Sequence, residues 1–360
     1  MTQRWAEVDL SAIRHNLQHV ASLQPEGVGV IAVVKAYGYG HGAVPVAEAS
    51  LQAGAWGLAV STLEEAQQLR GLPQLEGERL LVMGGLVPEE APAAVAAACA
   101  ISCYSEEMIR ALAAAADPEQ PVPVHLKVDT GLGRLGCTPE EAPALAALIS
   151  GSPGLRLAGT FTHFASSESD PELTRAQYDR FSSVLERLGV DPGLRHAGNS
   201  GSALRYPEVA LDAVRIGIAL YGCEGEGLRP AMTVRGLVTH VKTVPAGATV
   251  GYGATWRAER ETRVATVAMG YADGVLRARG GRGEVLVRGR RAPLIGRVSM
   301  DAVTLDVSAV PEVAVGDAAT FIGADGEERI SAEEVASWSG TNSYEVVTAV
   351  GRRVQRRYSE

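Results

Sequence analysis

Up to about residue 225, short apolar segments rich in β-branched residues alternate with amphipathic, helix-like segments. Eight candidate strands lie in this region: Val28–Val34, Trp56–Val60, Arg79–Met83, Ile101–Tyr104, Val122–Val128, Leu155–Phe164, Leu194–Ala197 and Ala213–Leu220. Strands that alternate with helices are typical of parallel β/α units, and eight such units close into a barrel. The sequence therefore predicts an α/β fold with an N-terminal (β/α)8 TIM-type barrel. A doubly wound open sheet is the alternative, although it usually has fewer strands.

Local signals predict where helices of this region begin and end. Ser61 and Glu64 have the spacing of a capping box. Pro139 is expected just inside a helix start. The longest amphipathic run covers residues 171–188, and Gly189 is a natural stop after it.

After about Arg229 the pattern changes to strands without long helices between them. The strands expected there are Met232–Val244, Thr262–Met269, Glu284–Val287, Val298–Val307 and Ala318–Ile322, followed by short helices at Ser331–Trp338 and Ser343–Val350. We expect a barrel domain over residues 1–228 and a C-terminal, mostly antiparallel β domain over residues 229–360. The chain up to about residue 10 is a candidate to join the β domain.

Composition excludes several classes of protein. The net charge is −9 and no basic patch is evident, so we expect no nucleic-acid partner. The first nine residues lack the apolar core of a signal peptide, and the most apolar stretches, Ala91–Ile101 and Ala142–Ile149, are too short to span a bilayer. We therefore expect a cytoplasmic protein without a membrane partner.

The four cysteines give no sign of a disulfide framework or a metal site. Cys99 and Cys103 have the spacing of one helical face, but no histidine or further cysteine completes a ligand set. We expect these cysteines, with Cys137 and Cys223, to be small buried hydrophobes.

Lysine is scarce in this chain. Of 33 lysines and arginines, only Lys35, Lys127 and Lys242 are lysines. A lysine that persists among arginines is a candidate nucleophile, because arginine cannot lose its proton. Chance survival is the other interpretation.

The segment Gly131–Gly136 matches the dinucleotide pattern GxGxxG and follows a predicted strand. However, it follows the fifth strand, and the acidic residue expected near the end of the next strand is absent. We therefore do not interpret it as a nucleotide site.

Reactive residues gather at the carboxyl ends of the predicted strands, where barrel enzymes place their active sites. These residues are Lys35, Tyr39, Lys127, Asp129, Arg134, His163, Asn199, Ser200, Arg215 and Gly217. Each alone has an ordinary explanation, such as a solvated lysine, a core histidine or a turn. Their coincidence at one rim favours a catalytic site, and the loops after the last two strands are suited to hold a phosphate.

Over nearly its whole length the chain resembles bacterial alanine racemases. The resemblance is carried by Ala32–Ala36 with Tyr39–Gly42, Leu126–Gly131 with Arg134–Gly136, Thr162–Ala165, His196–Ser200, Val214–Ile218, Gly251–Thr255, Gly270–Gly274, Gly296–Asp301 and Asn342–Glu345. The resemblance implies a pyridoxal 5'-phosphate enzyme that interconverts L- and D-alanine and supplies D-alanine for peptidoglycan. It also implies a homodimer with composite active sites.

Residue roles follow from the same resemblance. Lys35 would be the Schiff-base lysine, and Arg215 would donate to the pyridine nitrogen. The cofactor phosphate would be bound by Tyr39, Ser200, Gly217, Ile218 and Tyr344, and Asn199 would also bind the cofactor. The substrate would be bound by Arg134, Tyr252, Tyr271, Met300 and Asp301, of which Tyr252, Met300 and Asp301 would come from the neighbouring subunit. His163, Lys127 and Arg277 would support the site.

Racemisation needs two acid/base groups on opposite faces of the cofactor. In the family the lysine, here Lys35, handles the D-enantiomer, and the tyrosine, here Tyr252, handles the L-enantiomer. Tyrosine has an ordinary pKa of about 10 and needs nearby cations to act as a base. His163 and Arg215 are the candidates for that influence.

Two further expectations concern Arg215 and Lys127. Arginine is a donor only, so Arg215 would keep the pyridine nitrogen unprotonated and favour return of the proton to the α-carbon. Lys127 would carry a carbamate (N-carboxylysine) that positions Arg134. A simple Lys127–Asp129 ion pair is the alternative.

Three rival functions remain open at this point. An amino-acid decarboxylase on the same barrel would pair the pyridine nitrogen with an acid, whereas Arg215 fits here. A cofactor-homeostasis protein would consist of the barrel alone, without the domain that carries Tyr252. Broad-specificity racemases resemble secreted proteins, and no signal peptide is evident.

Overall fold

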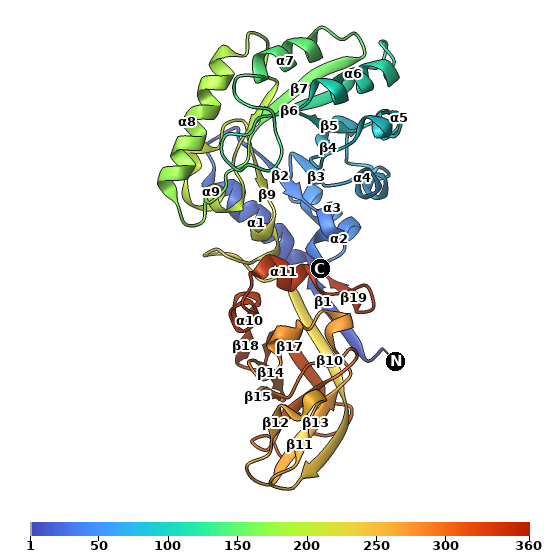
Figure 1. Cartoon of the computed structure of the whole chain (residues 1–360), viewed down its shortest axis with the longest axis vertical. Coiled ribbons are helices and arrows are strands. Elements are labelled where there is room, and N and C mark those ends of the chain that lie inside the picture. Colours follow the sequence, from blue (N-terminus) through green and yellow to red (C-terminus); the bar gives the residue numbers. More distant parts are fainter. Residues whose placement is uncertain (1) are drawn as a thin grey trace.

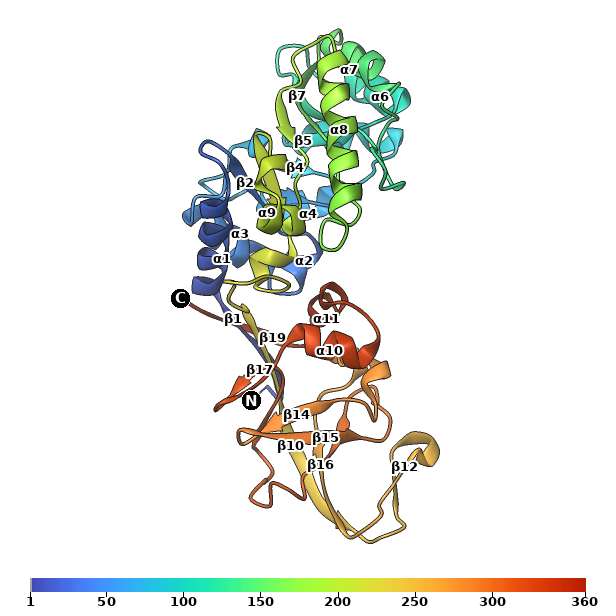
Figure 2. The same cartoon turned by 90° about the vertical axis from the view of Figure 1, so that its left-hand side faces the viewer.

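The computed structural model describes residues 2–360. A barrel and a β domain are stacked end to end along the long axis (Figures 1 and 2). The barrel is closed and its strands are β2 (Gly29–Val33), β3 (Gly57–Val60), β4 (Leu80–Val82), β5 (Ala100–Cys103), β6 (Val122–Lys127), β7 (Leu155–Phe161), β8 (Leu194–His196) and β9 (Ala213–Ile216). It closes where β2 runs parallel to β9, with Val30 opposite Val214. The predicted eight-stranded barrel is confirmed.

Helices surround the barrel strands, as Figures 1 and 2 show. They are α1 (Leu10–Leu23), α3 (Ala43–Gln52), α4 (Leu63–Leu69), α5 (Ala91–Ala96), α6 (Glu106–Ala115), α7 (Ala142–Ser150), α8 (Pro171–Arg187) and α9 (Ser200–Arg205). The long helix α8 begins at the N-cap Asp170, whose side chain accepts the backbone N–H of Leu173. It buries Phe181 and Val184 against the barrel and is followed by Gly189 in a left-handed conformation.

Two predicted helix starts are wrong. The capping box lies one residue later than expected: Thr62 caps Glu65, and Glu65 caps Thr62 in return. Thr62 is the residue in the extended conformation that an N-cap needs. Pro139 is not inside a helix, because Thr138 and Glu141 bond to each other in a turn and α7 begins only at Ala142.

The cysteine interpretation is partly corrected. Cys99 and Cys103 do not share a helical face, because Cys103 ends strand β5 and Cys99 precedes it. All four cysteines are free and buried, as expected for small hydrophobes.

The β domain is built on one nine-stranded sheet. In sheet order the strands are β18 (Glu328–Ile330), β17 (Ala318–Asp325), β14 (Glu284–Val287), β15 (Arg290–Ile295), β16 (Val303–Asp306), β13 (Thr262–Val267), β10 (Met232–Val244), β1 (Arg4–Asp9) and β19 (Gln355–Ser359). Strand β1 pairs antiparallel with β10 and parallel with β19. Strands β11 (Thr249–Val250) and β12 (Trp256–Arg257) form a separate hairpin.

The mostly antiparallel sheet is confirmed, although the expected strand set is incomplete. The expected strands omit β11, β12, β15, β18 and β19. The first residues of the chain do join this domain, as the sequence suggested, because β1 pairs with β10. One expected strand also begins too early. It is expected from Val298, but residues 298–302 form a loop and β16 begins only at Val303.

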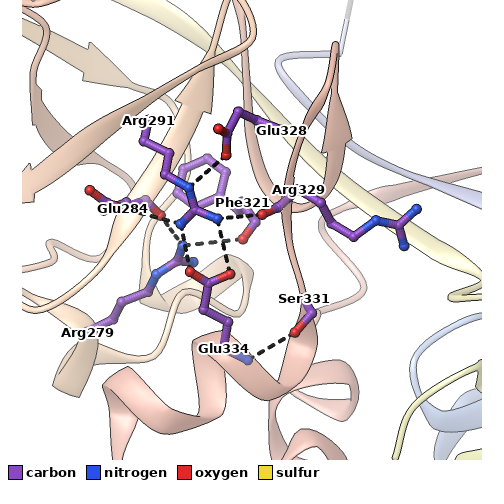
Figure 3. Close-up of polar contacts among 8 residues, drawn as sticks. All are labelled: Arg279, Glu284, Arg291, Phe321, Glu328, Arg329, Ser331 and Glu334. Atoms are coloured by element: carbon purple, nitrogen blue, oxygen red, sulfur yellow. Dashed lines mark hydrogen bonds and ion pairs between the residues drawn. The ribbon is translucent and has the colours of Figure 1, made fainter. Parts of the chain in front are cut away.

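Helices α10 (Ala332–Ser339) and α11 (Ser343–Thr348) lie at the junction of the two parts (Figures 1 and 2). Figure 3 shows how α10 is attached to the sheet: Arg291 of β15 donates to Glu284 of β14 at 3.0 Å, Glu328 of β18 at 2.9 Å and Glu334 of α10 at 2.6 Å. Buried Arg279 lies beside this group. The network fixes α10, and through it the start of α11.

Within residues 2–360, no helix is both long and apolar enough to cross a membrane. In the same range no three His, Cys, Asp or Glu side chains come together in a way that could hold a metal ion.

Candidate active site

A cavity of about 570 Å³ opens at the carboxyl ends of the barrel strands. Most of the predicted site residues line it: Lys35, Tyr39, Lys127, Arg134, His163, Asn199, Ser200, Arg215, Gly217, Ile218 and Tyr344. All but Tyr344 come from the barrel rim, and Tyr344 comes from α11 of the C-terminal part.

Lys35 opens the short turn α2 (Lys35–Tyr39), directly after strand β2 and Val34. The four residues that follow Lys35 all have left-handed backbone conformations, with φ from 47° at Tyr39 to 60° at Gly38. L-residues rarely adopt this conformation, so the turn is strained, and both of its ends line the cavity. Burial and the nearby Arg134 guanidinium lower the pKa of Lys35, which favours the neutral, nucleophilic amine.

The loop after β6 is organised by Asp129. Its carboxylate accepts the backbone N–H groups of Gly131 and Leu132 at 2.9 Å and of Gly133 at 2.8 Å. A Cβ atom on Gly136 would lie 2.6 Å from the Asp129 nitrogen. The glycines of the GxGxxG pattern therefore close a tight loop around a carboxylate and do not begin a helix, as a dinucleotide site would require.

Lys127 ends strand β6 and is buried. No ion pair between Lys127 and Asp129 is present in the described residues, so the simple pairing is not observed. The Lys127 ammonium instead lies over the ring of Phe161 at 5.5 Å. Burial, followed by the charges of Arg134 and Arg215, lowers the pKa of Lys127 to about 8.

Arg215 of β9 is buried and lines the cavity. It donates to the backbone oxygen of Thr162 at 2.7 Å, to His196 Nδ1 at 2.8 Å and to His163 Nδ1 at 3.2 Å. Burial lowers the pKa of Arg215 to about 9, so the group stays charged near neutral pH. Its partners are carbonyls and imidazoles, and no carboxylate pairs with it in residues 2–360.

Both histidines bonded to Arg215 are held uncharged. Burial and the Arg215 charge keep the pKa of His163 and of His196 well below the ordinary range. His196 Nε2 lies 2.9 Å from His125 Nδ1, so the chain of hydrogen bonds continues to a second buried imidazole. His163 therefore brings no positive charge to the site. Of the two residues expected to lower the pKa of Tyr252, only Arg215 is a cation.

Sequence reasoning did not single out His125 and His196 as site residues. Their signal was weak, because a histidine within a strand is usually an ordinary core residue.

Hydrogen-bond donors converge at one end of the cavity. Ser200 Oγ accepts the backbone N–H of Gly217 at 2.9 Å and of Ala219 at 3.3 Å. A Cβ atom on Gly217 would lie 2.4 Å from the Tyr39 hydroxyl, so a larger residue there would displace this hydroxyl. Burial raises the pKa of Tyr39 to about 12 and also raises the pKa of Tyr344. Both hydroxyls therefore keep their protons and can donate to a phosphate.

The residues present fit pyridoxal phosphate. The lowered amine pKa of Lys35 suits covalent attachment to an aldehyde, and the donors near Ser200 suit a phosphate. Arg215 offers a charged donor to a ring nitrogen. The guanidinium groups of Arg134 and Arg215 also give the cavity a positive charge that favours anions.

Five predicted site residues do not line this cavity: Tyr252, Tyr271, Arg277, Met300 and Asp301. All belong to the β domain. Tyr252 is 72% exposed and Met300 52% exposed, and Asp301 pairs with Arg353 at 2.7 Å. One chain therefore does not bring Lys35 and Tyr252 into the same site.

Comparison with known proteins identifies the family. The model of the alanine racemase N-terminal domain matches residues 8–225, and that of the C-terminal domain matches residues 231–358. This chain belongs to the alanine racemase family. It is 43% identical to the alanine racemase of Desulforamulus reducens, over 98% of each chain. It is 41% identical to that of Desulfovibrio desulfuricans, over 99% of this chain and 98% of the relative.

Solved structures agree with the sequence relatives. Alanine racemase from Bacillus anthracis with bound L-Ala-P has a TM-score of 0.92 and 37% identity, covering 100% of this chain and 96% of that one. The alanine racemase from E. faecalis has a TM-score of 0.93 and 35% identity, covering 99% of this chain and 98% of that one. The predicted membership and fold are confirmed, and the chain is a racemase of the pyridoxal-phosphate-dependent class. The decarboxylase and barrel-only alternatives find no support.

The pKa of Lys127 predicts a pH-dependent contribution to stability. Its ordinary pKa is 10.5 and its folded pKa about 8, so between these values the unfolded chain binds more protons than the folded one. The free energy of unfolding should therefore rise with pH across this interval. Denaturant unfolding of wild type and Lys127→Met is measured in buffers free of carbon dioxide. As pH rises through this interval, the free energy of unfolding of wild type should increase relative to that of Lys127→Met. Lys242→Met is the matched control and should follow wild type; a pH-independent difference for Lys127→Met would contradict the lowered pKa.

Proposed function

We propose that this racemase interconverts L- and D-alanine, with Lys35 of one subunit and Tyr252 of a second subunit as its two acid/base groups. Its product would supply D-alanine for cell-wall peptidoglycan. The observation that carries the proposal is the Lys35 amine: it lines a cavity rich in cations, and burial and Arg134 lower its pKa.

Pyridoxal phosphate, when bound, supplies a conjugated ring that stabilises the negative charge left by removal of the substrate α-proton. Lys35 would hold the cofactor covalently, and Arg215 would donate to its ring nitrogen. The phosphate would be bound by Tyr39, Ser200, Gly217, Ile218 and Tyr344, and Asn199 would also bind the cofactor. The convergence of their hydroxyl and backbone groups on one end of the cavity supports this assignment.

The proton at the substrate α-carbon must leave on one face and return on the other. The Lys35 Nζ atom would carry the proton on the face used by D-alanine, and the Tyr252 hydroxyl on the face used by L-alanine. Because Tyr252 lies outside the cavity of its own chain and is 72% exposed, it would act in a partner's site. Tyr271 and Met300 are also exposed side chains of the β domain, and they support a homodimer in which the β domain contacts the partner. Arg277 and Asp301 would lie at the same interface.

Arg134 would bind the substrate carboxylate, and a carbamate on Lys127 would position Arg134. A lysine amine reacts with carbon dioxide only when it is neutral. A pKa of about 8 and the missing Asp129 ion pair support such a neutral fraction near physiological pH.

Arg215 also bears on which reaction is catalysed. As a charged donor without a carboxylate partner, it would leave the ring nitrogen unprotonated. This favours return of the proton to the α-carbon. The uncharged state of His163, which accepts from Arg215, supports this role for Arg215 as the donor.

We place the domain boundary at residues 228–229, with β1 as part of the C-terminal sheet. The interval between the two family matches supports this division, as does the pairing of β1 with β10. We also propose that the enzyme works in the cytoplasm, where four free, buried cysteines fit a reducing environment.

The purified holoenzyme should convert either enantiomer of alanine into the racemic mixture. Chiral chromatography of the product measures this directly, with a Lys35→Ala variant as the control. Release of carbon dioxide in place of racemisation would refute the proposed function.

Borohydride reduction of the holoenzyme should fix the cofactor to the peptide that contains Lys35. The lowered pKa of its amine makes it the preferred site of attachment. Mass spectrometry of the digested protein locates the label. Label on Lys127 or Lys242 would contradict the assignment of Lys35.

Mixing Lys35→Ala and Tyr252→Phe subunits should restore activity that each variant lacks alone, because one hybrid site of each dimer would hold both intact groups. About half the activity per hybrid dimer is expected, since one of its two sites is intact. Subunit exchange is verified with differently tagged chains. If exchange is complete and no activity returns, the shared site is wrong.

A further inference from the structure

The turn that follows Lys35 does not adopt a conformation that L-residues prefer. Ala36 has a φ of 52°, Tyr37 of 58° and Tyr39 of 47°, with Gly38 between them at 60°. In this region the Cβ atom crowds the following carbonyl oxygen. A run of consecutive left-handed residues persists only where surrounding contacts impose that conformation. Contacts from outside the turn must therefore hold it.

Arg356 of strand β19 reaches the end of this turn from the C-terminal part of the chain. Its Nε and Nη2 atoms both donate to the backbone oxygen of Gly40, at 2.9 and 2.6 Å. The same guanidinium donates to Val354 O at 2.7 Å and to the carbonyls of Val350 and Gly351. One side chain thus joins the turn after Lys35 to the segment that follows α11.

Two further contacts press the same side of the turn against the C-terminal part. A Cβ atom on Gly40 would lie 2.3 Å from the Val347 oxygen, so the backbone of α11 touches the turn directly. The guanidinium groups of Arg352 and Arg356 each lie 5.5 Å from the centre of the Tyr37 ring. Figure 1 shows α2 beside α11 and β19 at the junction.

We propose that Arg356 is a positioning residue for the active site: by holding the Gly40 carbonyl, it imposes the left-handed turn that aims Lys35 and Tyr39 into the cavity. The proposal rests on the proposed function only in that Lys35 and Tyr39 are taken to bind the cofactor. Arginine is required because its planar fork serves several carbonyls at once, whereas lysine offers a single point charge.

The test compares Arg356→Lys with Arg357→Lys. Arg357 is the matched control because it lies on the same strand, is exposed, and stacks over Trp5 away from the turn. Hydrogen–deuterium exchange followed by mass spectrometry is measured on apoenzyme and holoenzyme. The informative peptide covers residues 34–42, where the amides of Gly38, Gly40 and Gly42 are bonded within the turn.

In Arg356→Lys, exchange of this peptide should speed up about tenfold, the effect of losing charged hydrogen bonds that hold one segment. Exchange of barrel strand β6 should not change. Pyridoxal phosphate, titrated by its absorbance, should bind about tenfold more weakly for the same reason. Unchanged exchange in residues 34–42, or a uniform increase across the whole chain, would overturn the proposal.

A second substitution separates an action through the turn from a general attachment of the two domains. Glycine adopts the left-handed conformation without steric cost, so adding Ala36→Gly to Arg356→Lys should restore much of the lost protection and cofactor affinity. No recovery in the double variant would overturn the proposal. Hydrogen exchange of the apoenzyme involves neither cofactor nor substrate. If exchange in residues 34–42 of the Arg356→Lys apoenzyme is unchanged, the result therefore counts against the role of Arg356 alone. Lack of alanine turnover by wild type would count against the proposed function alone.

Discussion

The buried guanidinium of Arg215 ties together three neighbouring strand ends of the barrel. It belongs to β9 and donates to Thr162 and His163 beyond β7 and to His196 at the end of β8. A buried cation without a carboxylate is tolerated only when its N–H groups are paired, so the rim must hold carbonyls and imidazoles in place around it. The rim of the cavity is therefore built around this charge.

Burial and the fixed guanidinium charges together set the protonation of the neighbouring groups. Burial is the largest cause of the lowered pKa values of Lys35, Lys127 and His163, and the guanidinium charges act in the same direction. Arg134 lowers the pKa of Lys35, Arg134 and Arg215 lower that of Lys127, and Arg215 lowers that of His163. A cavity that contains fixed guanidinium charges thus attracts anions while keeping its amines partly neutral. Both properties suit an enzyme that binds a phosphate and a carboxylate and uses an amine as a nucleophile and base.

The two parts of the chain depend on each other at the junction. The C-terminal part supplies Tyr344 to the cavity and Arg356 to the turn after Lys35. It also carries Tyr252 away from the cavity of its own chain. The Arg291 network holds α10 to the sheet (Figure 3), and α11, which carries Tyr344, packs against α10. A single chain therefore builds the cavity that contains Lys35 but leaves Tyr252 outside it.

The sequence by itself determined the barrel, because each strand and helix carries its own periodicity, and it placed Lys35, Lys127 and Arg215 at strand ends that must meet at one rim. It suggested that the first residues join the β domain, but it did not determine that β1 pairs with β10 and β19 across more than 200 residues. Nor did it determine the bonds of Arg215 to His196 and of Arg356 to Gly40. Local patterns hold no information on such partners. The left-handed turn after Lys35 was also decided by tertiary structure alone, since Ala36 and Tyr37 have no intrinsic preference for it.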